Sequence, residues 1–185
     1  MNVEIEGSYS YEQYYYGTGN ENKFYNNSWL GTVAFYPFAL TALQLDYVQG
    51  QSILLEDQEY PATSNVDVVY RKTDVETQTY SINLRQAFTA SDSFIRPMIS
   101  IGWARRISLN SGYTDFRDNS TGQVDRVTQP EQDLKQDLTQ LAVYLKFRLF
   151  KEFYLSVNAR TLFGGLEIAK ANQNVRVFVG FSWLL

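Results

Sequence analysis

The sequence contains no cysteine and no histidine among its 185 residues. The lack of cysteine excludes disulfides, thiol catalysis and cysteine-based zinc sites. The lack of histidine removes the commonest general base and metal ligand. The net charge is −4, from 16 basic and 20 acidic residues, which gives a nucleic-acid partner no electrostatic support. We therefore expect neither a cofactor nor a nucleic-acid partner.

Long apolar runs are also lacking. No stretch approaches the roughly 18 consecutive apolar residues of a membrane helix. The opening Met1-Asn2-Val3-Glu4 has neither the basic start nor the apolar run of a secretory signal. A chain of 185 residues suits one domain, so we expect residues 1–185 to form a single domain without a signal peptide. Aromatic residues are abundant instead, at 16 % of the chain.

The segment LAVYLKFRLF, residues 141–150, places two charges inside an apolar run. From 139 to 149 the odd positions are Thr, Leu, Val, Leu, Phe and Leu, whereas the even positions are Gln, Ala, Tyr, Lys and Arg. This strict alternation predicts a strand with one apolar and one polar face. Lys146 and Arg148 then share the polar face, so neither charge enters an apolar environment.

Seven further windows alternate in the same way: residues 3–12, 29–38, 43–47, 79–88, 95–103, 155–163 and 175–185. In 29–38 the facing is ambiguous, and we place Trp29, Val33 and Phe35 on the apolar side. Pro97 lacks a donor for the sheet ladder, so we expect a local distortion there. Eight strands result, and nothing in the sequence suggests a long helix.

Charge is confined to the polar faces of these windows. The apolar faces are large and often aromatic, whereas the polar faces mix ions with Ser, Gly, Ala, Asn and Thr. A soluble sandwich or barrel also alternates, but small residues beside opposite charges suit a cramped shared interior. The pattern favours an eight-stranded antiparallel up-and-down transmembrane β-barrel, apolar outside and polar inside.

The connections alternate between short and long. Short turns fall near 37–41, 89–93 and 151–152, and long polar segments span about 15–27, 50–77, 105–137 and 164–173. Short turns at one rim and long loops at the other are typical of such barrels. Val66 to Arg71 still alternates and could extend the fourth strand beyond the bilayer, with Lys72, Asp74 and Glu76 facing outward.

Aromatics gather near both strand ends, as interfacial belts do: Tyr14, Tyr15, Tyr16, Trp29, Trp103 and Phe163 at the long-loop rim, and Phe35, Phe38, Phe88, Phe94, Phe150, Phe153 and Trp183 at the other.

Eight amphipathic strands ending in VFVGFSWLL, residues 177–185, resemble the small outer-membrane barrels of the OmpA/OmpX type. The resemblance implies an integral protein of the bacterial outer membrane, with short periplasmic turns, long extracellular loops, and lipid and lipopolysaccharide around a monomer. It also implies that the last strand is read by the barrel-assembly machinery through Gly180, Trp183 and Leu185. The sequence departs from the last-strand pattern of this family at two positions. The final residue is Leu rather than an aromatic residue, and Phe178 occupies a position that is usually polar. A separate C-terminal periplasmic domain is not expected.

The polar faces place ten charged side chains in the predicted lumen. Eight strands leave an interior that side chains can just fill, so we expect a salt-bridged plug without a wide pore. Closure brings the first strand beside the last, which predicts that Glu4 or Glu6 meets Arg176. A gated or narrow conducting path is the alternative. The ten residues are Glu4, Glu6, Glu12, Asp46, Arg85, Arg96, Lys146, Arg148, Arg160 and Arg176.

Two enzymatic activities are known among small outer-membrane barrels, lipid A acyl transfer and lipid A deacylation, and both resemble histidine-dependent machinery. Because the sequence has no histidine, we do not expect an enzyme. The leading hypothesis is a non-enzymatic barrel whose loops serve membrane integrity, surface recognition or adhesion. The alternative is a small-solute or hydrophobic-compound transporter of the OmpW-like kind. Tyr25, Tyr60, Tyr113 and Phe116 are candidates for loop contacts. The acidic loop residues Glu56, Asp57, Glu59, Asp115 and Asp118 either bind divalent cations that bridge lipopolysaccharide or form a solvated surface.

Overall fold

The computed structural model describes residues 2–17, 19–57, 59–165 and 175–185. Over these ranges the chain forms nine strands, and no helix there is long and apolar enough to cross a membrane. The strands are β1 (Asn2–Tyr16), β2 (Asn22–Tyr36), β3 (Thr41–Glu56), β4 (Tyr60–Thr63), β5 (Val66–Ala87), β6 (Ile95–Asp118), β7 (Val124–Phe150), β8 (Phe153–Phe163) and β9 (Arg176–Leu184).

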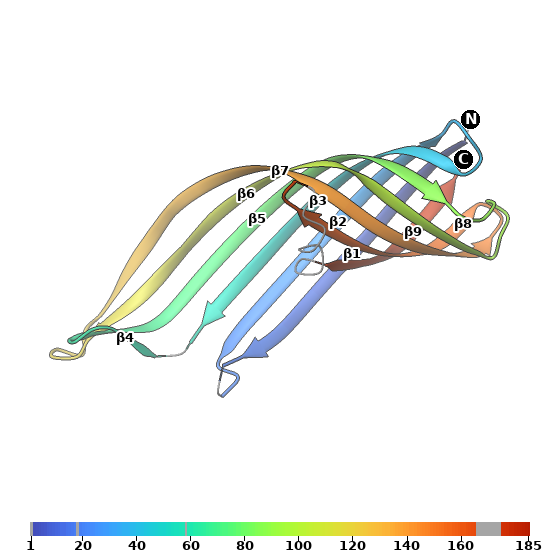
Figure 1. Cartoon of the computed structure of the whole chain (residues 1–185). Helices are drawn as coiled ribbons and strands as arrows, with labels where there is room; N and C mark the ends of the chain where they lie inside the picture. Colours follow the sequence, from blue (N-terminus) through green and yellow to red (C-terminus); the bar gives the residue numbers. More distant parts are fainter. Residues whose placement is uncertain (1, 18, 58, 166–174) are drawn as a thin grey trace.

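All strands except β4 form a closed antiparallel barrel. Neighbours in sequence pair with each other, β3 pairs with β5, and β1 closes the ring by pairing with β9. The predicted eight-stranded up-and-down barrel is confirmed. β4 is a short addition to the free end of β5. Both chain ends lie at the end of the barrel that carries the short turns (Figure 1).

The barrel is apolar outside and polar inside, because alternate side chains of each strand point to opposite faces. The fully buried residues are mostly polar or charged, whereas large apolar side chains are exposed on every barrel strand except β8, whose outward-facing residues are half-buried. Such an exposed apolar surface would be unstable in water and suits the hydrocarbon of a bilayer. The ambiguous window 29–38 faces as predicted, with Trp29 outward at 65 % exposure and Thr32, Ala34 and Tyr36 inward.

The expected long loops are mostly strand. β8 and β9 have 11 and 9 residues, the length that crosses a bilayer, but β5, β6 and β7 have 22, 24 and 27 residues. β7 is therefore about 16 residues longer than β8, or about 50 Å at roughly 3.3 Å per residue. Alternation had predicted this only for residues 66–71. The loop expected at 164–173 lies mainly outside the described residues.

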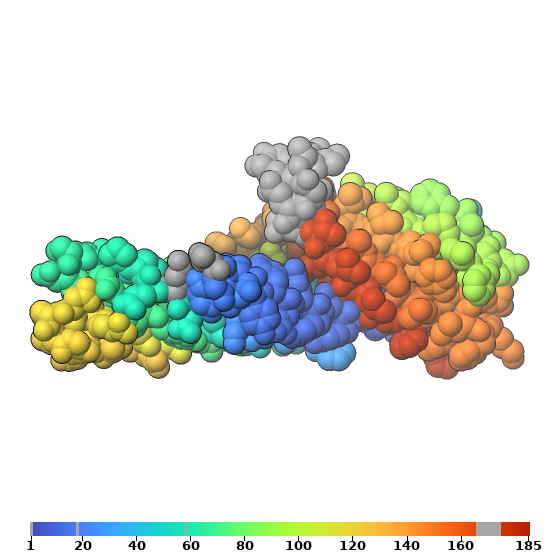
Figure 2. Space-filling view, turned by 90° about the horizontal axis from the view of Figure 1, so that it is seen from below, coloured from blue at the N-terminus to red at the C-terminus, as the bar shows by residue number. Residues whose placement is uncertain are grey.

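These long strands continue beyond the barrel as a curved sheet, which we call the extension. The extension carries the hairpin ends of β1–β2, β4–β5 and β6–β7 (Figure 1). It makes the molecule elongated, with the β4–β5 and β6–β7 ends farthest from the short turns (Figure 2). The ladder between β1 and β9 stops at Tyr9, and the ladder between β7 and β8 stops at Thr139. Residues 10–16 and 124–138 are therefore edges of the extension.

Exposed aromatic side chains form two belts on the barrel. One belt contains Tyr9 in tilted contact with Trp29 (ring centroids 4.6 Å apart), Tyr47 beside Tyr80 (5.1 Å), and Trp103. The other, at the short turns, contains Phe38, Phe88, Phe94, Phe150 and Trp183. The prediction of Tyr14 to Tyr16 in the first belt is wrong, because they lie farther out in the extension, and Phe163 is buried rather than exposed.

The distortion expected at Pro97 is absent. β6 pairs with β7 through Pro97 opposite Leu145 without a shift in register. The Pro97 carbonyl accepts from the Phe88 amide, so the side of Pro97 that lacks an N–H faces β5. β5 ends at Ala87, and the missing donor therefore falls where that ladder has already finished.

Candidate functional site: a charged network inside the barrel

The lumen near the short turns is filled by a cluster around Glu4 and Lys146. Lys146 Nζ donates to Glu4 Oε1 and lies 2.6 Å from Glu6 Oε2. Arg85 Nη1 lies 2.6 Å from Glu4 Oε1, and Arg96 Nη1 lies 3.4 Å from Glu4 Oε2. All these side chains are essentially inaccessible to solvent. Two carboxylates thus offset most of the charge of three cations that would otherwise be costly to bury.

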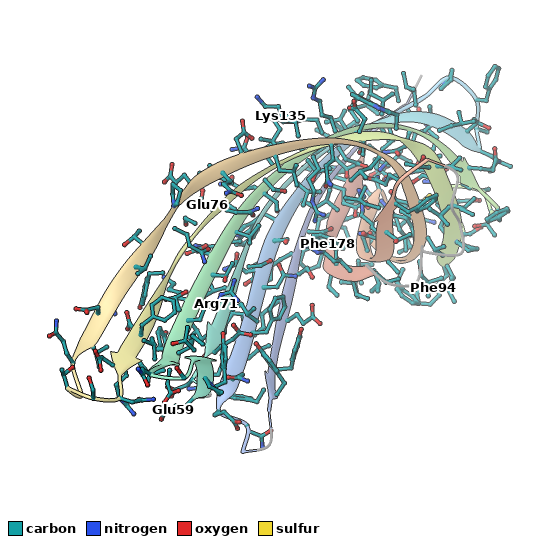
Figure 3. The ribbon with its side chains drawn as sticks, turned by 60° about the vertical axis from the view of Figure 1, so that its left-hand side comes forward. Glu59, Arg71, Glu76, Phe94, Lys135 and Phe178 are labelled. Carbon is teal, nitrogen blue, oxygen red and sulfur yellow. The ribbon has the colours of Figure 1, made fainter. Side chains whose placement is uncertain are left out.

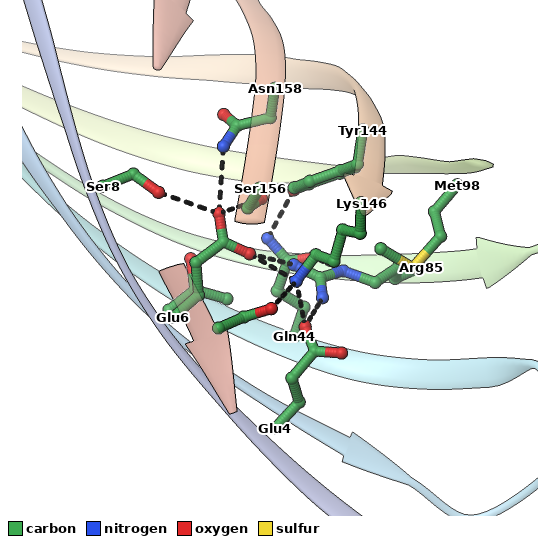
Figure 4. Close-up of polar contacts among 12 residues, drawn as sticks. Glu4, Glu6, Ser8, Gln44, Arg85, Met98, Tyr144, Lys146, Ser156 and Asn158 are labelled. Carbon is green, nitrogen blue, oxygen red and sulfur yellow. Dashed lines mark hydrogen bonds and ion pairs between the residues drawn. The ribbon is translucent and has the colours of Figure 1, made fainter. Parts of the chain in front are cut away.

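The second oxygen of Glu6 is held by neutral groups. Ser8 Oγ, Ser156 Oγ and Asn158 Nδ2 each donate to Glu6 Oε1 at 3.0 Å. These donors come from β1 and β8, so the carboxylate links the two strands that flank β9 (Figure 4). The small side chains of the lumen face leave the space that this arrangement needs.

A second centre forms around Asp46. Arg160 Nη1 donates to Asp46 Oδ2 at 2.7 Å, and Thr32 Oγ1 donates to Oδ1 at 2.6 Å. Three further lumen residues, Ser81, Asn83 and Gln140, donate to Oδ2 at 2.8–3.2 Å. A buried carboxylate with this many donors is held in one orientation.

Gln44 and Tyr144 join the two centres. Gln44 accepts from Arg85 Nε at 2.5 Å and donates to Asp46 through Nε2. The Tyr144 ring lies between two guanidinium groups, 4.4 Å from Arg85 and 5.3 Å from Arg160. Its hydroxyl also lies 2.7 Å from Gln44 Nε2. The charges therefore form one continuous network across the lumen, which we call the plug.

The short-turn end of the lumen is closed by larger side chains. Tyr36, Tyr154 and Leu184 are buried there with Ala34 and Ala42. The Tyr154 hydroxyl donates to the Ser91 carbonyl in the turn between β5 and β6. This apolar layer separates the plug from the space beyond the short turns.

Seven of the ten predicted lumen charges meet in the plug, and three do not. Arg148 instead donates to the carbonyls of Lys151 and Asp92, at 2.7 Å each. It stands two residues from the end of β7, where the register with β8 shifts, so its side chain reaches the turns. Glu12 is exposed, because it lies beyond the last β1–β9 pair.

The predicted contact of Glu4 or Glu6 with Arg176 is wrong. Leu184 stands opposite Glu4 across the β1–β9 seam, and Ser182 stands opposite Glu6. Arg176 begins β9, about eight residues from Leu184, or about 26 Å along the strand. Its guanidinium donates to Ser28 Oγ at 3.2 Å. The pairing was predicted because β1 and β9 are adjacent. It does not form because Arg176 and the two glutamates lie at different heights along these strands.

Sequence reasoning named the ions but missed the neutral residues that organise them. Gln44, Tyr144, Ser156 and Asn158 all take part in the plug. Each occupies a lumen-facing position of a window that alternates, so their facing was available as a signal. Their partners were not, because those depend on the shear of the closed barrel.

The extension carries its own ion pairs. Arg126 forms a two-pronged contact with Asp115, at 2.8 and 2.9 Å, and covers the Tyr113 ring at 3.8 Å. The Arg126 guanidinium lowers the pKa of Asp115 below its ordinary value. Arg117 pairs with Glu59 at 2.8 Å. Figure 3 shows Glu59, Arg71 and Glu76 along the extension, far from Phe94 at the short turns.

Other predicted loop residues are distributed over the extension. Tyr60 is exposed at 40 %, whereas Tyr25, Tyr113 and Phe116 are half-buried. Asp118 accepts three hydrogen bonds from the Ser120–Thr121 turn, which lower its pKa. Glu56 lies 3.9 Å from Arg71. Several of the acidic candidates for cation binding are therefore already engaged by residues of the chain.

The predicted assembly signal lies on the closing strand. Trp183 and Leu185 point outward, at 57 % and 59 % exposure. Gly180 points inward against β1, where a Cβ would stand 2.0 Å from the Gly7 carbonyl oxygen. Gly180 thus has a structural reason to be glycine that is separate from recognition by an assembly machinery.

Comparison with known proteins rests on structure, since neither a family model nor a curated protein matches the sequence. The N-terminal β-barrel domain of Pseudomonas aeruginosa OprF aligns with a TM-score of 0.58 and 12 % identity, covering 100 % of this chain and 97 % of that chain. The fold is that of a small outer-membrane barrel. Pseudomonas aeruginosa OprG aligns with a TM-score of 0.59 and 10 % identity, covering 100 % of this chain and 95 % of that chain. Yersinia pestis Ail aligns with a TM-score of 0.50 and 9 % identity, covering 100 % of this chain and 98 % of that chain.

Proposed function

We propose that the chain is an integral, non-enzymatic protein of the bacterial outer membrane that presents its extension outside the cell. The barrel anchors the protein and the plug closes it. The extension then serves surface recognition or adhesion, and the anchored barrel contributes to membrane integrity. Lipid and lipopolysaccharide surround a monomeric barrel in this proposal.

The observation that carries the proposal is the combination of a filled lumen with strands that greatly outrun the barrel. The plug and the apolar layer at the short turns occupy the path that a transported solute would need. Strands of 22 to 27 residues extend a surface well beyond the barrel, as presentation to an outside partner requires and a path through the lumen does not. One neighbour is described as the attachment invasion locus protein, in complex with the heparin analogue sucrose octasulfate. That description is consistent with surface presentation by this fold.

Conductance of the refolded protein separates the proposal from a transporter. We expect a heat-modifiable band on gels, which reports a folded barrel, together with no regular single-channel steps in planar bilayers. Regular steps from such folded protein would contradict the plug and favour the OmpW-like alternative.

Trimming the extension tests its role directly. Replacing residues 109–133 by a short turn removes the outer part of β6–β7 at a matched register pair, Ser108 and Leu134. Cells that display this variant should lose binding to cultured-cell and glycan surfaces but keep the barrel and their resistance to detergent. Equal binding by the trimmed and the full protein would contradict a role for the β6–β7 extension in recognition.

A further inference from the structure

Above the plug, on the side of the extension, the lumen contains a small cavity of about 120 Å³. At about 30 Å³ per water molecule, it has room for a few waters or one small ion. Its wall includes three arginines, Arg106 from β6, Arg160 from β8 and Arg176 from β9. The cavity thus gathers positive charge from three strands of the barrel.

The arginines of this cavity are not equally neutralised. Arg160 is bound to Asp46 in the plug. Within the described ranges, Arg106 and Arg176 form no ion pair, and the buried Nε of Arg106 has no hydrogen-bond partner. Among the described residues, Arg106 repels Arg176 and the exposed Glu12 attracts it.

The cross-strand register makes the arrangement costly. Arg160 and Arg176 stand directly opposite each other on β8 and β9, and like charges in that position destabilise a sheet. A buried guanidinium N–H without a partner adds the cost of lost hydration. Nothing in the plug requires Arg106 or Arg176, because the seven plug charges are already joined without them. Among the described residues, Arg106 and Arg176 are therefore two half-buried cations that no carboxylate of the plug neutralises.

We infer that this cavity is a binding site for a small oxyanion, a phosphate, sulfate or carboxylate group, held between Arg106 and Arg176. Guanidinium groups present paired N–H donors that match the oxygens of such anions. The bound anion offsets the repulsion across β8 and β9 and occupies the free Nε of Arg106. It enters from the extension side, because the plug closes the other. The group is either a free ion or the terminal group of a larger molecule. This site does not depend on the proposed surface function.

The test uses the refolded full chain in a sugar-headgroup detergent that carries neither phosphate nor sulfate. Inorganic phosphate is added at constant ionic strength with chloride as the reference, and the side-chain Nε–Hε resonances of the arginines are followed by NMR. We expect saturable shifts at Arg106 and Arg176, with the unfolding midpoint rising as the site fills. A second arm places the protein in nanodiscs with phosphatidic acid and no free phosphate. Shifts in that arm alone identify a lipid phosphate as the source, and shifts in neither arm overturn the site.

Variants separate the site from general charge effects. Arg106→Gln should weaken phosphate binding roughly tenfold or more, since hydrogen bonds to charged groups contribute on that scale. Arg105→Gln is the matched control, because Arg105 is the neighbour of Arg106 on β6 but is exposed. The phosphate affinity of this control variant should equal that of the parent. Without phosphate, Arg106→Gln should be at least as stable as the parent, with a heat-modifiable band as proof of folding. Equal weakening by both variants would overturn the site and leave only nonspecific attraction.

Discussion

At the scale of single residues, the central device is one lysine shared between two glutamates of one strand. Glu4 and Glu6 are two positions apart on β1, so both point into the lumen and both contact Lys146. Lys146 then belongs to the apolar-looking segment 141–150 without entering lipid. Removing one member leaves the others as buried ions without full compensation, which is the costly case.

Glu4→Gln should therefore destabilise the barrel by about 3–5 kcal/mol, measured by urea unfolding in lipid vesicles. Glu12→Gln is the matched control on the same strand and should change the unfolding free energy by less than about 0.5 kcal/mol, as exposed substitutions do. Equal effects of the two substitutions would show that the plug does not hold the barrel together.

The Asp115–Arg126 pair provides a pH-dependent contact in the extension. Because Arg126 lowers the pKa of Asp115, the pair stabilises the extension above the ordinary aspartate pKa. That stabilisation is lost as pH falls through the lowered pKa of the folded state. NMR titration of the Asp115 carboxyl should show the low pKa, and Arg126→Gln should return it toward the ordinary value. An unchanged Asp115 titration in that variant would exclude the contact.

At the scale of elements, alternation was enough to define the strands but not their ends. Period-2 patterning identified the eight barrel strands and the facing of almost every side chain. It failed in residues 105–137, where Gln, Asp and Lys stand on both faces of β6 and β7. Strands bathed by water on both sides have no apolar face to mark them, so their sequence looks like a loop.

The closing seam between β1 and β9 depends on a glycine. Gly180→Ala should destabilise the barrel by about 1–3 kcal/mol, the usual cost of overpacking, because its Cβ meets the β1 backbone. Gly7→Ala, on the facing strand, has open space for its Cβ and should fold like the parent. Refolding yield on gels, without any assembly machinery, is the measurement. Equal yields for both variants would contradict the tight seam.

At the scale of the whole molecule, the sequence could predict a closed barrel with an ionic interior, because the covalent order of apolar and polar residues fixes both faces. It could not predict which ions meet. Arg148 and Arg176 both occupy lumen-facing positions of strands that alternate clearly. Arg148 nevertheless lies at the short-turn end of the barrel, whereas Arg176 lies at the end next to the extension. Pairing across the lumen depends on strand tilt and stagger, which arise only when the sheet closes.

The claim on which all of this depends is that the apolar face meets lipid hydrocarbon. The most direct measurement is fluorescence quenching of a single tryptophan, Leu145→Trp with Trp29, Trp103 and Trp183 replaced by Phe, in vesicles with brominated acyl chains. Leu145 points outward between the two aromatic belts, so bromines near the middle of the bilayer should quench it strongly while aqueous iodide should not. Quenching by iodide alone, or none by the brominated lipids, would contradict the account.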